Sequence, residues 1–208
     1  MRVATWLALF GIAASAGRVI NFDAGPLGKT PPDWISVAGH GRAPRWEIRR
    51  DGSAATQPYV LAQVSNESGA DRVPLAILKA MMLRDGDVSV RIKPISGREV
   101  QGGGLVWRYQ NEDNYYLVRA SALEKNVAVY RVQNGQRIRL GAVANHEVLA
   151  NDWNILKVSV RGNRYQVYLD HRRILQGYDG TYTGSGQVGL CTVADTVAYF
   201  DDFRVYPK

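Results

Sequence analysis

Apolar and polar residues alternate along most of the chain from residue 87 to residue 206. Within residues 87–93, Val88, Val90 and Ile92 alternate with polar neighbours, so the three apolar side chains share one face of an extended strand. Alternation of this kind is typical of antiparallel sheets that have one buried face. Further strand-like runs follow at residues 105–109, 115–120, 126–132, 137–143, 153–160, 164–169, 187–192 and 198–206.

Glycine and asparagine residues separate these runs. Asn134-Gly135 is the strongest of these signals for a β-hairpin, because both residues tolerate the positive φ of its turn. Residues 18–86 are less regular, and residues 75–83 fit either a short helix or a strand. Many short strands joined by such turns predict an all-β fold with two antiparallel sheets packed as a sandwich.

The first residues have the features of a signal peptide. The positive start Met1-Arg2 precedes an almost wholly apolar run at residues 3–14, and Ala14-Ser15-Ala16 has the small-x-small form that signal peptidase accepts. The run is shorter than the about 20 helical residues that span a bilayer. We therefore predict a signal peptide at residues 1–16, a single β-sandwich domain at residues 17–208 with no membrane span, and a secreted or periplasmic location. A buried N-terminal helix is the alternative.

The chain has a formal charge of +7 and a single cysteine. Its basic residues are scattered rather than gathered in one run, so nucleic acid is not expected as a partner. The excess of positive charge favours attraction to an acidic polymer or to the cell envelope. Cys191 cannot form an intrachain disulfide and is predicted to be a buried structural thiol.

Six short segments follow one another in an order that is not general to β sandwiches. They read Gly-Leu-Val-Trp-Arg-Tyr at 104–109, Asn-Tyr-Tyr at 114–116, Trp-Asn-x-Leu-x-Val at 153–158, Tyr-x-Val-Tyr-Leu-Asp at 165–170, Val-Gly-Leu at 188–190 and Phe-Asp-Asp-Phe-Arg-Val at 200–205. Over residues 85–206 the chain thereby resembles the concanavalin A-like (laminin G-like) jelly rolls of secreted bacterial proteins. More narrowly, it resembles the group called family 16 glycoside hydrolase-like or 3-keto-disaccharide hydrolase-like. The resemblance implies an all-β, antiparallel two-sheet jelly-roll sandwich that binds carbohydrate on a concave sheet.

One departure from that resemblance argues against the simplest enzyme. Active family 16 hydrolases carry a Glu-x-Asp-x-Glu strand, which places two carboxylates about 5 Å apart on one face. The chain has no such triple, and its nearest acidic pair, Glu112-Asp113, lies in a turn. We therefore expect a non-catalytic module that binds an oligo- or polysaccharide, and leave open whether the chain is an enzyme. The alternatives are a glycan-cleaving hydrolase with an unrecognised site and a laminin G-like module that binds proteins.

Two arginines are candidates for the sugar site. Arg108 and Arg119 each alternate with an apolar neighbour, and if both neighbours are in the core the two guanidinium groups lie side by side on an outer sheet face. Forked donors suit sugar hydroxyls or a uronate carboxylate, and Tyr115 shares the face of Arg119 and offers a ring for stacking. Asn126 and Glu124, in the next loop, are weaker candidates. The alternative is a solvated face with cation–π pairing.

Asp201 is a candidate metal ligand. It is predicted to share a strand face with Phe203 and Val205, where a free carboxylate would be costly. Calcium suits a site made of carboxylate and backbone carbonyl oxygens, and the resemblance implies a structural calcium between the last strand and the first loop. The alternative is an aspartate that backbone amides satisfy. The three histidines show no metal-ligand spacing.

Overall fold

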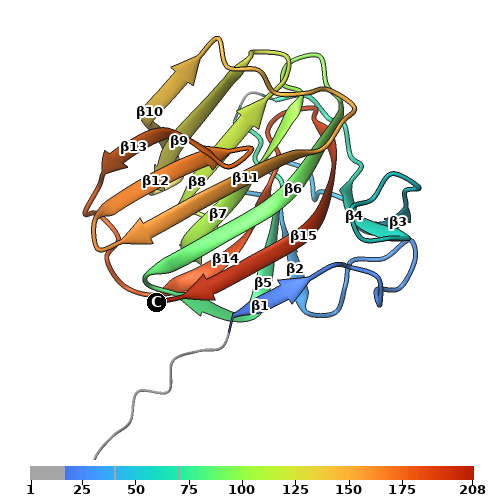
Figure 1. The fold of residues 1–208 in the computed structure, drawn as a ribbon, viewed down its shortest axis with the longest axis horizontal. Helices are drawn as coiled ribbons and strands as arrows, with labels where there is room; N and C mark the ends of the chain where they lie inside the picture. The colour runs from blue at the N-terminus through green and yellow to red at the C-terminus, as the bar shows by residue number, and fades with distance from the viewer. Residues whose placement is uncertain (1–16, 40, 70) are drawn as a thin grey trace, which may run out of the picture.

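The computed structural model describes residues 17–39, 41–69 and 71–208, which form two sheets that face each other (Figure 1). The predicted signal peptide at residues 1–16 lies outside the described residues. Sheet A has eight strands. Seven of them follow the order β13 (Arg172–Tyr178), β12 (Arg164–Leu169), β11 (Asn154–Arg161), β6 (Gly86–Ser96), β15 (Val197–Pro207), β4 (Tyr59–Gln63) and β3 (Trp46–Arg50). The eighth strand, β1 (Arg18–Ile20), pairs with β15. Sheet B has seven strands, in the order β10 (Gln136–Ala144), β9 (Asn126–Gln133), β8 (Asn114–Ser121), β7 (Gly102–Asn111), β14 (Gly186–Cys191), β5 (Leu75–Leu83) and β2 (Trp34–Val37).

The predicted antiparallel two-sheet sandwich is confirmed, because every pairing between these strands is antiparallel. Residues 75–83 form strand β5 and not a helix. Strand β13 is one that the alternation did not indicate. No helix long and apolar enough to cross a membrane occurs in the part of the chain that the structure describes.

The main core fills the space between the two sheets. In sheet B, Trp107 stacks on Tyr116 with ring centroids 5.3 Å apart and planes inclined by 16°, and both side chains are buried. Aromatic pairs of this kind stabilise a core beyond the area that they bury. Because successive strand residues point to opposite faces of a sheet, the alternate residues Tyr115, Leu117 and Arg119 of β8 lie on the outer face of sheet B.

A second, smaller apolar cluster covers part of that outer face. Its buried members are Val73, Leu75, Ile77, Val106, Tyr115, Leu117, Val132 and Cys191. Cys191 is fully buried, and burial raises the pKa of its thiol to about 12. The thiol therefore stays protonated at neutral pH, as the prediction of a structural cysteine requires.

Two β-bulges interrupt the strands beside predicted site residues. The pairing of β7 with β8 shifts within residues 107–111, where Arg108 has a φ of +49°. The pairing of β15 with β6 shifts within residues 201–204, where Asp202 has a φ of +53°. A bulge inserts an extra residue into one strand and re-aims its side chains. Simple alternation therefore does not give the direction of either site residue.

Candidate functional site

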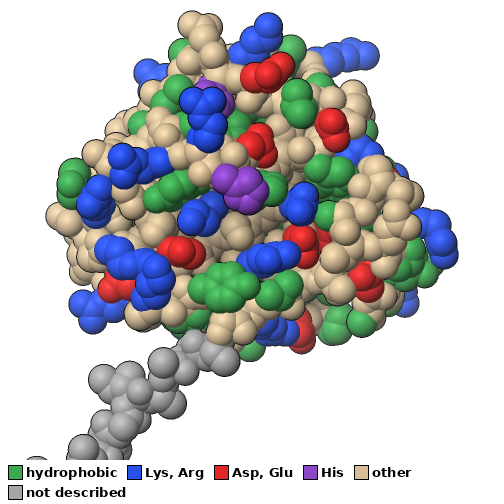
Figure 2. Space-filling model, in the orientation of Figure 1, with side chains coloured by type: hydrophobic (Ala, Val, Ile, Leu, Met, Phe, Trp, Pro, Cys, Tyr) green, Lys and Arg blue, Asp and Glu red, His purple; other side chains and the backbone are tan. Residues whose placement is uncertain are grey.

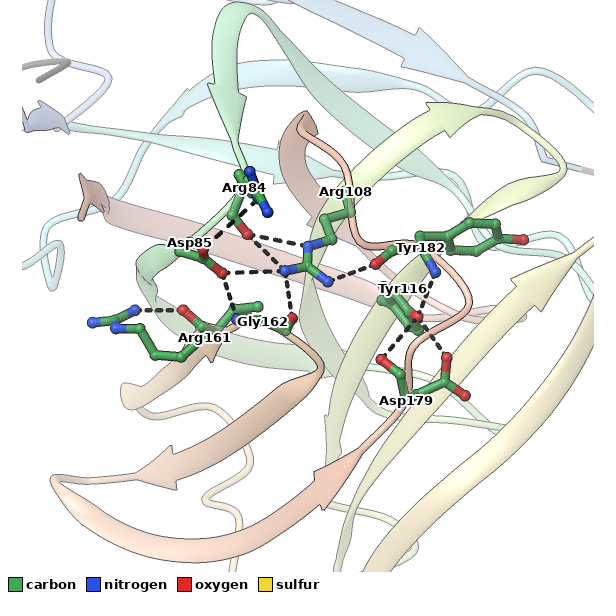
Figure 3. A network of polar contacts seen from close by, with 9 residues as sticks. Arg84, Asp85, Arg108, Tyr116, Arg161, Gly162, Asp179 and Tyr182 are labelled. Atoms are coloured by element: carbon green, nitrogen blue, oxygen red, sulfur yellow. Dashed lines mark hydrogen bonds and ion pairs between the residues drawn. The ribbon is translucent and has the colours of Figure 1, made fainter. Parts of the chain in front are cut away.

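Arg108 is buried at one end of the sandwich and does not reach the outer face of sheet B. Its guanidinium donates to three backbone carbonyls and pairs with one carboxylate. These partners are the carbonyls of Arg84, Gly162 and Tyr182 and the carboxylate of Asp85, which lies 3.3 Å away (Figure 3). Only 1% of Arg108 is exposed. The predicted side-by-side arrangement of Arg108 and Arg119 on an outer face is therefore wrong.

The bulge in β7 and the chemistry of the guanidinium explain this position. The positive φ of Arg108 turns its side chain out of the regular alternation, toward the place where turns of both sheets meet (Figure 3). A guanidinium carries five N–H donors in a rigid fork, so one arginine satisfies several carbonyls that would otherwise be buried without partners. These contacts give Arg108 a structural role at the end of the sandwich.

Tyr116 and Asp179 extend this polar network. The Tyr116 hydroxyl donates to the Asp179 carboxylate at 2.6 Å and accepts from the Tyr182 amide at 3.0 Å (Figure 3). Burial, followed by the hydrogen bond to Asp179, raises the pKa of Tyr116 to about 12. The phenol therefore stays neutral at physiological pH, and its two hydrogen bonds tie β8 to residues 179–182, which follow β13.

The structure brings Arg119, Asn126 and Glu124 together on the outer face of sheet B. Arg119 Nη2 lies 3.2 Å from Asn126 Oδ1 and 2.5 Å from Glu124 Oε2, and only 6% of Arg119 is exposed. Tyr115 lies on the same face of β8 but four residues away, which is about 13 Å along a strand. Ligand binding by these residues stays a prediction, although Arg119 already uses donors within the protein.

Tyr115 lines a hollow of about 440 Å³ on the outer face of sheet B, called the sheet B hollow below. Its lining residues come from four separate segments of the chain. They are Gly39, Asp71, Val73, Glu112, Tyr115, Val132, Gly135, Gln136 and Arg137. Tyr115, Val132 and Val73 belong to the outer apolar cluster and form an apolar floor. The other side chains supply carboxylate, amide and guanidinium groups.

Two turns place part of this polar lining. The β9–β10 hairpin turns through Asn134 and Gly135, with φ values of +50° and +75°, which confirms the predicted hairpin, and the next two residues of β10 both line the hollow. Glu112 lies in the adjacent β7–β8 turn. Hydrogen bonds fasten the two turns together, from Gly135 N to Asp113 O at 3.1 Å and from Asn134 N to Asn114 Oδ1 at 3.2 Å. The lining therefore stands on two mutually braced turns.

The sheet B hollow is lined mainly by hydrogen-bonding groups, and Tyr115, the aromatic residue among its described lining residues, is only 2% exposed. Two further tyrosines lie beside the hollow. The Tyr109 and Tyr115 ring centroids are 5.8 Å apart, and the Arg137 guanidinium lies 5.4 Å over the Tyr130 ring. Burial raises the pKa of Tyr115 above its ordinary value, so its phenol stays neutral. Sugars present hydroxyl groups that suit donors and acceptors. The polar side chains of the lining can therefore bind sugar hydroxyls.

The sequence analysis named Tyr115 as a candidate but not the polar side chains that line the hollow with it. The sequence contains a signal for two of these side chains, because Gln136 and Arg137 directly follow the predicted Asn134-Gly135 turn. Strand β8 pairs with β9 so that Tyr115 faces Val132, close to that turn. Asp71, in contrast, lies in a loop. The sequence of this loop has no periodic pattern, so its position over the sheet could not be predicted.

Asp201 is buried but does not lie on the predicted face of β15. The bulge keeps both Phe200 and Phe203 in the main core and leaves Asp201 paired with Arg91 of β6, whose side chain is on the outer face of sheet A. The predicted shared face with Phe203 and Val205 is therefore wrong, because one inserted residue reverses the alternation between Asp201 and Phe203.

Protein donors satisfy the Asp201 carboxylate. Oδ2 accepts from Thr56 N at 2.8 Å, and Oδ1 accepts from Thr56 Oγ1 at 2.9 Å and from Asp202 N at 2.7 Å. Calcium takes about six to eight oxygen ligands, and the described residues contain no cluster of three or more His, Cys, Asp or Glu that could hold a metal ion. These contacts fit an aspartate held by protein donors, and calcium at Asp201 stays a prediction.

A chelator tests the calcium prediction. With calcium bound at Asp201, EDTA is expected to lower the melting temperature of the full chain, because a ligand bound only to the folded state stabilises it. The Asp201→Asn variant, which keeps the size of the side chain, should then melt at one temperature with and without EDTA. Differential scanning fluorimetry gives both values. Unchanged melting of the unmodified chain would decide for protein donors alone.

Solved structures of carbohydrate-active proteins share this fold, whereas no family model and no curated protein sequence matches the chain. The chain is similar to the carbohydrate-binding module CBM66 from Bacillus subtilis, with 20% identity, a TM-score of 0.63, and 82% of this chain and 93% of that chain covered. It is also similar to a β-glucanase from Bacillus licheniformis, with 10% identity, a TM-score of 0.62, and 93% and 99% covered. A third similar structure is the K247S mutant of the GH43 protein BlXynB from Bacillus licheniformis, with 15% identity, a TM-score of 0.59, and 91% and 39% covered. At these identities the likeness is one of fold, and that fold is an antiparallel jelly-roll sandwich.

Proposed function

We propose that the chain is a secreted, non-catalytic module that binds carbohydrate in the sheet B hollow. The observation that carries the proposal is the hollow itself, in which carboxylate, amide and guanidinium groups border a floor of buried apolar side chains. The likeness of fold to the module CBM66 and to the β-glucanase supports a carbohydrate ligand. The apolar run at residues 3–14 supports export.

Arg137 provides the sharpest test of this site. The Arg137→Ala variant is expected to weaken binding by about 1–3 kcal/mol, because water competes for each polar contact and a hydrogen bond from a charged group contributes at most about 3 kcal/mol net. Arg139→Ala is the matched control, since Arg139 is exposed on the same strand and does not line the hollow. A glycan array with the full chain would select the oligosaccharide, and titration calorimetry would compare the three proteins.

The outcomes of this test are distinct. Weaker binding in Arg137→Ala alone, with circular dichroism unchanged, supports the hollow as the sugar site. Equal affinity of all three proteins for a glycan that the parent binds would place the site elsewhere. Absence of any glycan ligand on the array would count against the carbohydrate proposal as a whole.

A glycan-cleaving hydrolase is the second candidate, because two carboxylates, those of Asp71 and Glu112, line the same hollow. Paired carboxylates are the usual machinery of glycoside hydrolysis. Release of reducing ends from the bound oligosaccharide would reveal the activity. Glu112→Gln should then abolish product formation while binding persists, and absence of product from the parent protein would decide for the binding module.

A further inference from the structure

A second hollow lies on the outer face of sheet A, the face seen in Figure 2, and is independent of the sheet B hollow. It has a volume of about 400 Å³ and is formed by outward side chains of β6, β11, β12 and β15 and of the turn after β12. We call it the sheet A hollow. Its functional side chains include Asp87, Arg91, Lys157, Tyr168, Asp202 and Arg204.

Asp202 holds two arginines at this hollow. Its Oδ2 lies 3.2 Å from Arg91 Nε and 3.1 Å from Arg204 Nη2. The Asp202 side chain is only 8% exposed, whereas those of Arg91 and Arg204 are 36% and 43% exposed. Each guanidinium has five N–H donors and uses one of them on Asp202. The buried Asp202 carboxylate therefore holds both guanidinium groups in place, while other N–H donors of the two arginines remain open to solvent.

Asp87, four residues before Arg91 in β6, forms ion pairs with three further cations. Its carboxylate lies 3.9 Å from Lys157 Nζ, 3.2 Å from Arg161 Nη2 and 3.8 Å from Lys208 Nζ. Burial raises the pKa of Asp87, but the Ser159 hydrogen bond and the three cations lower it overall, so the group stays ionised at neutral pH. Three cations, Arg91, Lys157 and Arg204, and two carboxylates, Asp87 and Asp202, line the hollow, so its lining keeps one positive charge in excess.

An aromatic surface adjoins these cations. Lys157 Nζ lies 4.2 Å from the centroid of the Tyr168 ring, and Tyr206 also lines the hollow. The combination differs from a plain basic patch, because fixed guanidinium pairs suit planar carboxylates and the tyrosine rings suit the apolar faces of sugars.

We propose that the sheet A hollow binds the carboxylate groups of an acidic polysaccharide, one that contains uronate residues. Arg91 and Arg204 donate hydrogen bonds to the uronate carboxylate through the N–H groups that Asp202 does not use, and Lys157 contributes a further positive charge. The proposal goes beyond the sugar site proposed for sheet B, and its failure would leave that site untouched.

Titration of the full chain with an oligogalacturonate tests the proposal, with an uncharged oligosaccharide of the same length and a single-stranded oligonucleotide of the same charge as comparison ligands. The Arg91→Gln/Arg204→Gln variant is expected to bind the oligogalacturonate at least about tenfold more weakly, because two charge-assisted donor groups are lost. Arg172→Gln is the control, since Arg172 is exposed on sheet A outside the hollow. Salt at about 1 M should also weaken parent binding, because the Debye length falls to about 3 Å.

Amide chemical shifts of the unmodified chain keep the test decisive if the double variant does not fold. Oligogalacturonate should shift amides in residues 89–91, 168–171 and 202–204, and not those around Tyr115. Absence of oligogalacturonate binding, unchanged affinity in the folded double variant, an equal loss in Arg172→Gln, or shifts confined to sheet B would each overturn the proposal. Equal binding of the uncharged oligosaccharide or of the oligonucleotide would also overturn it.

Discussion

Replacing Arg108 with alanine is expected to lower the free energy of unfolding by about 3–5 kcal/mol, the cost of removing one partner from a buried charged network. The guanidinium donates to the carbonyls of Arg84, Gly162 and Tyr182. Without it, these carbonyls lose a shared donor, and each buried polar atom left unpaired costs about 1–3 kcal/mol. Urea denaturation followed by tryptophan fluorescence measures the change.

Two variants separate this role of Arg108 from general effects of losing an arginine. Arg84→Ala removes an exposed side chain but leaves the carbonyl that Arg108 uses, so its stability should stay within about 0.5 kcal/mol of the parent. Arg108→Lys keeps the charge but lacks the fork, so it should recover only part of the loss. A destabilisation below about 1 kcal/mol in Arg108→Ala would show that water replaces the guanidinium, and would contradict the structural role.

The alternating strands were predictable because the side-chain period of a strand is fixed at two. Residues 87–93 show this directly, since Val88, Val90 and Ile92 are all buried between polar neighbours in β6. The Asn134-Gly135 hairpin was predictable for an equally local reason, the positive φ that its turn requires. Strand β13 was missed because Asp170 and His171, both with positive φ, form a turn without glycine.

The candidate site was less predictable because its geometry depends on bulges and on distant loops. Alternation alone predicts an outward-facing Arg108, but its partners at residues 84, 162 and 182 are 20 or more positions away in sequence. Asp201 is satisfied by Thr56, 145 positions away. The local sequence around each bulge does not predict which side chain changes direction, because that direction depends on partners that are distant in sequence.

Gly104→Ala is expected to destabilise the chain by about 3 kcal/mol, because a well-packed sheet has no room for the added methyl group. A Cβ at Gly104 would overlap the backbone carbonyl oxygen of Val118 in β8 and lie 2.8 Å from Cys191 Sγ in β14. Backbone cannot move aside as a flexible side chain can. Strands β7, β8 and β14 would therefore have to separate on the outer face of sheet B, beneath Arg119, which pairs with Gly104 in the β7–β8 register.

Gly184→Ala provides the matched control for this substitution. Gly184 is exposed, and a Cβ there would meet no heavy atom within 4 Å, so its stability should change by no more than about 0.5 kcal/mol. Thermal and urea unfolding of the two variants compare the same chemical change with and without a steric neighbour. Equal stability of the two proteins would mean that β7 and β8 adjust their spacing freely. The strands that carry Tyr115 would then be too mobile to hold the floor of the sheet B hollow in one arrangement.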